Sequence, residues 1–410
     1  MASLTTTAFA NALKILYSKG LEEVWYKKSP FLAWVNKSYN FEGASKQIVP
    51  LVAGIRGSTK FAEAMAAKSN PTLAKFLVTR VKDYVIGSID NEAMKASRSQ
   101  KGAMAQALKT QMDAALYEFG RSAAFQVWGD GTGTRGTVSS ESTVTLTLTD
   151  VNDMVKFEIG MVVEAKSSGG TLRSGSVAIT AIDRDAKTLT AAANWTTGIP
   201  GLVATDTIAR AGDYTASSSN VLSGVLAWIP PTAPTTGDSF FGQDRSVDVN
   251  RLSGTRVLGA GKTIEEIVFD AQAEAAINGA QVDTLWLNSK RRAELCKSLQ
   301  GKAMYQQTSV TSSGGQSGKV KVGFTGFVVP GEDGPVTIMS DPNCPYAYGL
   351  MTRKAAWELS CLDGCPHFAD EAGGKFMQET SADAIEFRLK VYWQLCCENT
   401  RDNILISWDA

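Results

Sequence analysis

The sequence predicts an α+β protein into which a small all-β domain is inserted. Three observations support this class. A helical pattern runs from Asp90 to Trp128, a stretch rich in Thr, Ser, Val and Gly follows at 137–213, and apolar and polar residues alternate strictly over 385–395. With 410 residues, 44% of them hydrophobic and 20% charged, the chain is long enough for two or three globular domains.

Charge and cysteine usage exclude several functional classes. Lys+Arg and Asp+Glu number 41 each, so the chain lacks the strong positive field of a dedicated nucleic-acid-binding protein. There is no basic and apolar leader and no membrane-spanning apolar run, which indicates a soluble protein made in the cytosol. All six cysteines lie after residue 295 without the spacing of a disulfide framework, so we expect reduced thiols.

The first 90 residues predict a short helix and two strands. A short helix is expected to carry Phe9, Leu13 and Leu16, and the aromatic-rich VWYKKSPFLAWV follows it. KQIVPLVAGI and AKFLVTRVKDYVIGSI read as two strands. The excursion between them, from about 54 to 75, is longer than a tight hairpin needs.

The long helix begins after Asp90, which is expected to be its N-cap. At about 1.5 Å per residue it would measure roughly 55–60 Å, with a bend at Gly102. A coiled coil is the alternative. Only part of the segment keeps the coiled-coil period, which favours a helix laid across a sheet.

GDGTGTRG at 129–136 matches G-x-G-x-x-G through Gly131, Gly133 and Gly136. A dinucleotide site needs a strand before this motif and a helix after it, and here the order is reversed, so we interpret it as a helix stop and linker. Short strands follow and predict a barrel or sandwich: VTLTLT, GMVVEAK, GSVAITAIDR, KTLTAAA and DTIARAG. In the turn DRDAKT, Asp183 and Asp185 lack the Gly and Glu of a calcium loop, which favours a solvated turn.

The C-terminal half predicts alternating helices and strands. We expect a helix at 263–277 that ends at Asn278-Gly279, a strand DTLWLN, a helix at 290–300 capped by Ser289, and an exposed Ser/Gly loop at 309–318. The alternation at 385–395 predicts a half-buried strand, and ILISW is expected to close a hairpin with it.

The stretch VLGAGKTIEE ends like a nucleotide-binding P-loop. Lys262 and Thr263 fit the phosphate and magnesium roles, and Asp341, at the end of PVTIMSD, could be a second magnesium ligand. However, Arg256 stands where the pattern requires its first glycine. We favour a helix start in which Thr263 is the cap and Glu266 completes the capping box.

The only histidine, His367, lies in CLDGCPHFAD close to two cysteines. Cys361, Cys365 and His367, with Asp363 or Asp370 as a fourth ligand, could bind zinc, but the spacing is not that of a known zinc motif. A turn with incidental thiols is favoured. We assign no catalytic, cofactor-binding or metal-binding residue, and no nucleophile-elbow pattern is present.

Several segments follow one another along the chain in a fixed order: an aromatic arm, strand pairs around a lysine-bearing loop, NEAMKAS at the start of the long helix, GDGTGTRG after it, GVLAWIPP, FFGQDRSVDVNRLSGTR, DTLWLNSKRRAEL, GPVTIMSDPNCPYAYGLMTRKAAWELS and RLKVYWQLCCENTRDNILIS. In this order they resemble the major capsid protein of tailed double-stranded DNA bacteriophages, whose coat fold is shared with encapsulins. The segments span nearly the whole chain, and none is a catalytic signature.

The resemblance implies a division of the chain into an N-terminal arm (1–45), an extended loop with flanking strands (46–88), a spine helix of a peripheral domain (89–136), an all-β insertion domain (137–213), an axial domain with connecting peripheral segments (214–360) and peripheral C-terminal strands (361–410). The insertion departs from the minimal fold. It resembles the accessory β-domain that some phages display on the outer shell surface.

The function implied by the resemblance is structural and not enzymatic. The chain would self-assemble through pentamers and hexamers into an icosahedral phage head that encloses double-stranded DNA without sequence specificity. Its partners would be copies of itself, with scaffolding, portal and decoration proteins, and no membrane. It would be located in the virion after assembly in the host bacterial cytoplasm. The alternatives are a P-loop NTPase that uses Lys262 and Thr263, and an encapsulin-like cargo shell.

Overall fold

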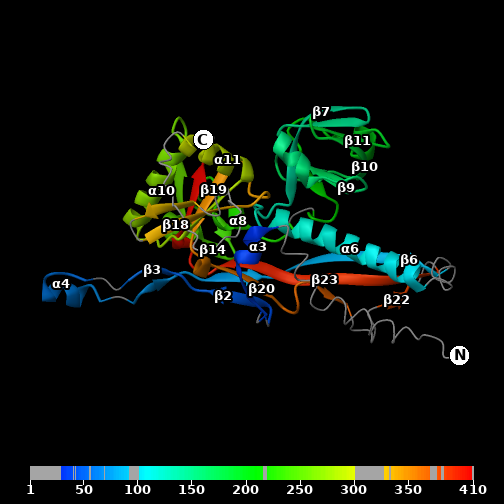
Figure 1. The fold of residues 1–410 in the computed structure, drawn as a ribbon. Coiled ribbons are helices and arrows are strands. Elements are labelled where there is room, and N and C mark those ends of the chain that lie inside the picture. The colour runs from blue at the N-terminus through cyan, green and yellow to red at the C-terminus, as the bar shows by residue number, and fades with distance from the viewer. Residues whose placement is uncertain are drawn as a thin grey trace, which may run out of the picture.

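A computed structural model describes residues 29–39, 41, 43–54, 57–68, 70–91, 101–215, 219–300, 327–331, 334–369, 376–379 and 383–408. Within them lie two six-stranded sheets, a closed barrel and one long helix, arranged as Figure 1 shows. The predicted helix with Phe9, Leu13 and Leu16 and the predicted loop at 309–318 lie outside the described residues. The mixed composition confirms the predicted α+β class.

The first sheet, here called the elongated sheet, is built around one long strand. Its strands are β1 (Asn36–Ser38), β6 (Val81–Asp90), β20 (Trp357–Cys361), β21 (His367–Phe368), β22 (Phe376–Gln378) and β23 (Ala384–Cys397). β23 pairs with β6 in antiparallel register from Ala384↔Asp90 to Trp393↔Val81. It also pairs with β20, β21 and β22, so this strand holds the sheet together.

The long helix α6 (Lys101–Gln126) lies along the elongated sheet, as predicted (Figure 1). Met112 and Leu116 pack in one cluster with Phe387 and Leu389, and the rings of Phe119 and Trp393 are 6.4 Å apart. Within the described residues, the helix therefore buries its apolar side against β23. The predicted start after Asp90 is not settled, because 92–100 lie outside the described residues and Asp90 itself ends β6.

The prediction that the strand at 385–395 is half-buried is wrong for its second half. Lys390 is 5% exposed and Gln394 1% exposed, although both alternate with the apolar residues. Gln394 Oε1 accepts a hydrogen bond from the backbone N–H of Ser223 at 3.0 Å. The amide nitrogen of the same side chain, Nε2, donates to the carbonyl of Thr79 at 3.2 Å. Segments distant in sequence thus cover the polar face, which the alternation alone could not indicate.

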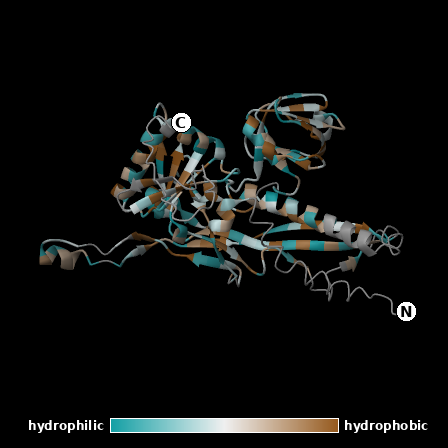
Figure 2. Ribbon diagram, viewed as in Figure 1, coloured by the Kyte–Doolittle hydropathy of each residue, from teal (hydrophilic) through white to brown (hydrophobic). Residues whose placement is uncertain are grey.

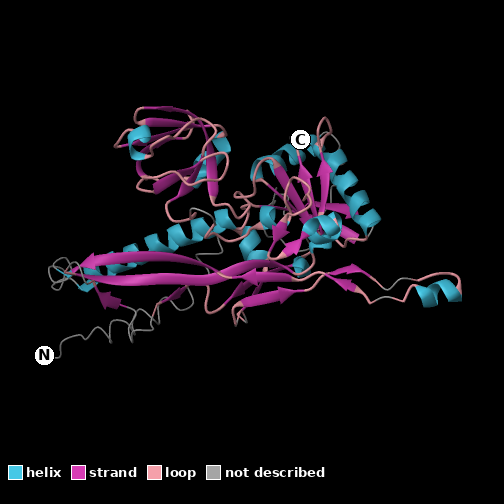
Figure 3. Cartoon of the chain, turned by 180° about the vertical axis from the view of Figure 1, so that it is seen from behind, coloured by secondary structure: helices cyan, strands magenta, loops and turns pink. Residues whose placement is uncertain are grey.

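The extended loop, defined here as residues 45–79, projects from the body. Its elements are β2 (Ser45–Ile48), β3 (Leu51–Ala53), α4 (Phe61–Ala66), β4 (Thr72–Leu73) and β5 (Phe76–Thr79). β2 pairs with β5, and β3 pairs with β4. Seen from behind, the loop and the far end of β23 point in opposite directions from the body (Figure 3).

The barrel is closed in the order β10-β11-β8-β7-β12-β9. Its elements are β7 (Thr134–Ser142), β8 (Thr145–Leu148), η2 (Val151–Lys156), β9 (Val162–Lys166), β10 (Val177–Asp183), β11 (Thr188–Ala191), α7 (Trp195–Gly198) and β12 (Thr207–Arg210). Leu146, Phe157 and Trp195 are fully buried in its separate core. Interpreting GDGTGTRG wholly as a linker is wrong for 134–136, because these residues already belong to β7.

The second sheet, here called the compact sheet, has the order β15-β24-β19-β16-β18-β17. Its strands are β15 (Thr255–Leu258), β16 (Thr284–Leu287), β17 (Phe327–Gly331), β18 (Gly334–Ser340), β19 (Tyr348–Thr352) and β24 (Asn403–Ser407). Apolar residues gather in these strands (Figure 2). α10 (Ile264–Asn278) and α11 (Ser289–Gln300) pack on one face, in the same cluster as Leu285 and Leu287.

Short elements connect the larger units: α3 (Pro30–Trp34), α8 (Val225–Trp228), β13 (Ser239–Phe240), β14 (Gln243–Asp244), η3 (Arg245–Val247), α9 (Val249–Ser253), η4 (Lys354–Ala356) and η5 (Thr400–Asp402). No helix among the described residues is long and apolar enough to cross a membrane.

The predicted hairpin between β23 and β24 is wrong. β24 lies in the compact sheet between β15 and β19, with Thr255↔Ile404 and Leu350↔Leu405 among its pairs. η5 leads the chain from one sheet to the other, and the side chain of Asn403 is fully buried at this crossing. Asn403 Nδ2 donates to the carbonyl of Asn399 at 2.8 Å, which holds the segment in a crossing and not in a tight turn.

The predicted helix caps are confirmed for α10 and corrected for α11. Thr263 and Glu266 form both hydrogen bonds of the capping box, and Gly279 ends the helix at φ +65 in the left-handed region. At α11, the side chain of Asn288 accepts from the backbone N–H of Lys290 at 2.9 Å, so Asn288 is the cap in place of Ser289.

Candidate assembly surfaces

The base of the extended loop is packed against the body. Ile48, Phe76 and Val78 are at most 2% exposed, and the rings of Phe76 and Trp228 are 5.4 Å apart in an edge-to-face arrangement. The backbone N–H of Leu77 donates to the carbonyl of Phe241 at 2.9 Å. The loop therefore leaves the body from a rigid base.

A lysine reinforces this base. Lys46 Nζ lies 2.7 Å from Glu358 Oε1 and 2.8 Å from Glu398 Oε1, so β2 is tied to the elongated sheet by two ion pairs. Burial lowers the pKa of Lys46, but the hydrogen bonds with Glu358 and Glu398 outweigh it and the pKa is raised. Burial raises the pKa of Glu358, but Lys46 outweighs it and the pKa is lowered.

The far half of the extended loop carries apolar side chains in solvent. Phe61 is 81% exposed and no residue of α4 is buried. Leu51 and Leu73 face each other across β3 and β4, and both are more than half exposed. Met65 adds to this surface. A projecting element with apolar side chains on its outer face is typical of a contact surface for another molecule.

Asp341, the candidate magnesium ligand, is an anchor for α3. Its Oδ2 accepts from Ser29 Oγ at 3.0 Å and from the backbone N–H of Phe31 at 3.1 Å. Its Oδ1 accepts from the backbone N–H of Asn343 at 2.8 Å, and the side chain is fully buried. Both oxygens are committed to protein donors, which leaves neither for a metal ion.

α3 joins the two sheets through an aromatic cluster. The ring of Phe31 lies 4.7 Å from Trp128, 5.3 Å from Trp286 and 6.1 Å from Trp357. These tryptophans follow α6, lie in β16 of the compact sheet and lie in β20 of the elongated sheet, respectively. α3 is therefore attached where the two sheets and the long helix meet.

Buried charges attach the barrel to the body. Arg210, the last residue of β12, lies 3.1 Å from Asp83 Oδ1 on β6 and 2.8 Å from Asp213 Oδ1. Ser122 Oγ and Gln126 Nε2 of α6 each donate to Asp83 Oδ2 at 3.1 Å. Burial lowers the pKa of Arg210, but Asp83 and Asp213 outweigh it and the pKa is raised. We call these five residues the barrel mount.

Arg135 extends this attachment into the barrel. It is 1% exposed, its Nη1 donates to the carbonyl of Lys156 at 2.9 Å, and its guanidinium lies 4.8 Å from the ring centre of Phe125 on α6. Burial lowers the pKa of Arg135 to about 10, so the side chain stays charged at neutral pH.

One residue of the barrel mount, Asp83, carries a signal in the local sequence. Asp83 alternates in phase with Val81 and Val85, whose side chains pack against the protein core. A charged residue at an inward position predicts a buried partner, because an unpaired buried charge is strongly unfavourable. The sequence pattern does not identify the partner, Arg210, because it lies 127 residues away along the chain.

The P-loop residues form no phosphate cradle. Lys262 Nζ lies 2.6 Å from Asp270 Oδ2, the backbone N–H of Lys262 donates to Gly259, and that of Thr263 donates to Glu266. Arg256 donates to the carbonyl of Pro230 at 2.6 Å. The groups that would bind a nucleotide are thus engaged within the chain.

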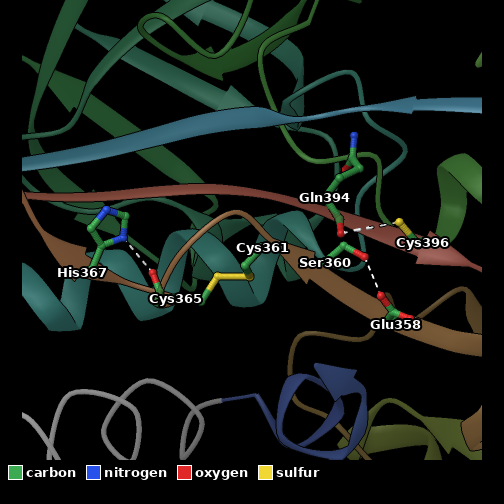
Figure 4. The surroundings of a disulfide bond; sticks show 8 residues. Glu358, Ser360, Cys361, Cys365, His367, Gln394 and Cys396 are labelled. Atoms are coloured by element: carbon green, nitrogen blue, oxygen red, sulfur yellow. Dashed lines mark hydrogen bonds between the residues drawn. A yellow bond between two sulfur atoms is a disulfide. The ribbon is translucent and has the colours of Figure 1, made fainter. Parts of the chain in front are cut away.

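The expectation of six reduced thiols is wrong for two of them: Cys361 and Cys365 form a disulfide (Figure 4). Cys361 pairs with Trp393 and His367 with Lys390, so both ends of this loop are fixed on β23 and the chain must fold back within a few residues. The Cα atoms of the two cysteines consequently lie 6.5 Å apart, within disulfide reach.

The disulfide leaves no pair of thiolates for the candidate zinc site. His367 Nδ1 is 2.8 Å from the carbonyl of Gly364, and Asp370 lies outside the described residues. Within the described part of the chain, no three His, Cys, Asp or Glu side chains are grouped so that they could hold a metal ion. At the candidate calcium loop in the turn DRDAKT, Asp183 Oδ1 accepts hydrogen bonds from the backbone N–H groups of Asp185 and Ala186 at 3.0 Å each. These hydrogen bonds close the turn.

No protein-family model matches the chain, and comparison with curated proteins finds no relative. Among solved structures, the chain is similar to one titled as the cyanophage A-1(L) capsid asymmetric unit, with 13% identity, 93% of each chain covered and a TM-score of 0.53. It also matches Mycobacterium phage Ogopogo, with 12% identity, 93% and 92% coverage and a TM-score of 0.42. The capsid of the native GTA particle matches with 9% identity, 92% and 90% coverage and a TM-score of 0.43.

The cyanophage structure carries the assignment of the fold, since the other two TM-scores lie below 0.5. The chain has the coat-protein fold of a phage capsid over nearly its whole length. The fold expected from the ordered segments of the sequence is thereby confirmed.

Proposed function

We propose that the chain is a structural major capsid protein. Copies of it assemble through pentamers and hexamers into an icosahedral phage head that encloses double-stranded DNA. The observation that carries this proposal is the extended loop, whose base is buried in the body and whose far half holds Phe61, Met65 and Leu73 in solvent. On a coat-protein fold, another copy of the chain supplies the surface that this loop lacks.

The physical argument concerns how many contacts one copy makes. A loop on one copy and its acceptor elsewhere on the next form a heterologous contact, and repeating that contact closes rings. Each contact can be weak, because a subunit leaves the shell only when several are lost together. The balanced count of 41 basic and 41 acidic residues limits repulsion between copies packed at high density.

This function has consequences for partners and location. The chain acts in the virion after assembly in the host cytoplasm, without enzymatic activity and without reading the DNA sequence. Scaffolding, portal and decoration proteins are its further partners. Residues 1–45 act as an arm, 46–88 hold the extended loop and its flanking strands, and the insertion at 137–213 is exposed on the outer shell surface. In this scheme 89–136 and 361–410 belong to the peripheral domain and 214–360 to the axial domain.

Electron microscopy of the purified protein tests the proposal. We expect closed shells or rings of five and six copies, and megadalton species in sedimentation. A protein that stays monomeric under every assembly condition would refute it. Shells from infected cells that protect DNA from nuclease support a phage head, whereas shells filled with protein support the cargo-shell alternative.

Nucleotide binding tests the NTPase alternative directly. Because Lys262 is paired with Asp270, we expect neither the wild type nor Lys262→Ala to bind ATP in equilibrium dialysis. Saturable ATP binding that Lys262→Ala abolishes would favour the NTPase.

A further inference from the structure

Helix α10 presents an apolar ridge to solvent. Phe269 is 54% exposed and Ile277 78% exposed, and Ala273 lies between them at helical spacing. Ile267, Ala271 and Ala275 are buried on the opposite side of the helix against the compact sheet. The ridge therefore points away from the sheet, and the described residues leave more than half of each of its two large side chains exposed.

The charges of α10 and its neighbour α11 have opposite signs. The charged residues within α10 are all acidic: Glu265, Glu266, Asp270 and Glu274. Those within α11 are basic except for one: Lys290, Arg291, Arg292, Glu294 and Lys297. Lys297 is exposed on the side opposite the buried Leu295, whereas Lys290 on that side donates to Asn152 Oδ1 of the barrel at 2.8 Å. On α10, Asp270 is paired with Lys262 and Glu266 completes the capping box, so Glu274 and Lys297 are the exposed charges of opposite sign that α10 and α11 offer to a partner.

The two helices are neighbours on the same face of the compact sheet. α10 packs against β15 and β24, at one edge of the compact sheet, whereas α11 packs against β18, near the other edge. Figure 1 shows α10 along the outer flank and α11 closer to the barrel.

We propose that α10 of one copy packs against α11 of a second copy, with Phe269 and Ile277 buried at the contact and Glu274 facing Lys297. This inference rests on the proposed function, because it names the partner surface within the shell. A second copy is the occupant that fits, since the same chain carries the apolar ridge with the exposed acidic Glu274 beside it and the exposed basic Lys297 on α11. Opposite charges across a contact favour the correct pairing and disfavour α10 against α10.

A charge exchange tests the pairing. Glu274→Lys and Lys297→Glu are each expected to raise the protein concentration needed for assembly at least tenfold, as light scattering and electron microscopy measure. The variant with both substitutions should return to within about threefold of the wild type, because the opposite charges face each other again. Asp185→Lys, an exposed change of the same charge in the barrel turn, is the matched control and should assemble like the wild type.

Zero-length cross-linking tests the contact without requiring shells. Equal amounts of ordinary and isotope-labelled protein are mixed and treated with a carbodiimide, which joins carboxylates and amines that touch. We expect a mixed-isotope peptide that links Glu274 to Lys297, and it should disappear in Glu274→Gln. Absence of this peptide in assembled wild-type protein would overturn the inference, as would single charge variants that assemble normally or an exchange variant that is not restored.

The two proposals fail in different ways. If wild-type protein forms the α10 to α11 cross-link but never a closed particle, the capsid function is wrong and the contact stands. If it forms shells without that cross-link, the capsid function stands and the contact is wrong.

Discussion

The barrel and the extended loop are both additions to the body, yet they solve the problem of apolar surface in opposite ways. The barrel closes on itself, and Leu146, Phe157 and Trp195 fill a core of its own. The extended loop has two strand pairs and no such core: its inner residues join the core of the body, and Phe61 at its far end is 81% exposed. The barrel is complete within one chain, and the loop is not.

The difference lies in where each element places its charges. The barrel meets the body through the buried barrel mount, in which Arg210 is held by Asp83 and Asp213. The loop meets the body mainly through apolar packing at Phe76 and through the partly exposed ion pairs of Lys46. A buried charge network fixes one position, while an apolar outer surface suits a partner that arrives later.

The largest expected effect is on assembly. Phe61→Ser combined with Met65→Ser removes apolar area from the far end of the loop. Burial of each such side chain contributes about 1.5–3 kcal/mol, so the pair is worth roughly 3 kcal/mol or more per contact, which is at least about a hundredfold in affinity. We expect no shells in electron microscopy, while thermal unfolding of the subunit is unchanged. Normal shells would show that the loop end makes no contact.

The next largest effect is on the barrel mount. Arg210→Met leaves Asp83 and Asp213 without their shared cation, which should lower the free energy of unfolding by about 3–5 kcal/mol. Adding Asp83→Asn and Asp213→Asn should recover most of this loss, because the uncompensated charges are then gone. Urea denaturation measures both. Arg388→Met, which removes an exposed ion pair with Glu386, is the control and should cost less than about 1 kcal/mol.

A smaller, pH-dependent effect is expected at the base of the loop. The lowered pKa of Glu358 stabilises the fold above its ordinary value of about 4.5, and this contribution is lost as the pH falls through the lowered value. Lys46→Met removes the largest cause of the lowered pKa of Glu358. The variant should be less stable than the wild type by about 1 kcal/mol at pH 7, and the difference should shrink as the pH falls below the ordinary value and Glu358 becomes protonated. A difference that stays constant with pH in urea denaturation would contradict this assignment.

The smallest effect is expected when the barrel is removed as a unit. A short Gly/Ser linker in place of 134–213, which also removes Asp213, together with Asp83→Asn to avoid a bare buried charge, should leave the body folded. Its free energy of unfolding should change by about 1 kcal/mol or less, since the barrel core is separate from that of the body. Circular dichroism and urea denaturation test this. Loss of all folded protein would show that the body depends on the barrel.

Local features of the fold were predictable from the sequence, whereas long-range pairings were not. The capping box of Thr263 and Glu266 and the stop at Gly279 follow from backbone chemistry within a few residues, and both predictions are confirmed. The predicted pairing of ILISW with β23, its nearest strand in sequence, is wrong. Strand pairing depends on which strands meet in space, and β24 meets β15 and β19.

The candidate site residues show the same division. Asp341 anchors α3 by accepting a hydrogen bond from Phe31, which is 310 positions away in the sequence. The local sequence PVTIMSD contains no sign of this contact and is equally compatible with a metal-binding strand end. The disulfide between Cys361 and Cys365 was missed because composition argues only about compartments, while the fold-back on β23 decides the distance. The exposed apolar residues of the loop were the part of the assembly surface that the pattern could suggest.

The positions of β23 and β24 have a consequence for synthesis on the ribosome. β23 is the strand around which the elongated sheet is built, β24 separates β15 from the rest of the compact sheet, and both follow every other strand of their sheets in the chain. Neither sheet can be completed until residues 384–407 have left the ribosome. A chain that terminates before residue 384 therefore lacks the strand that completes each sheet, and neither sheet can form in full.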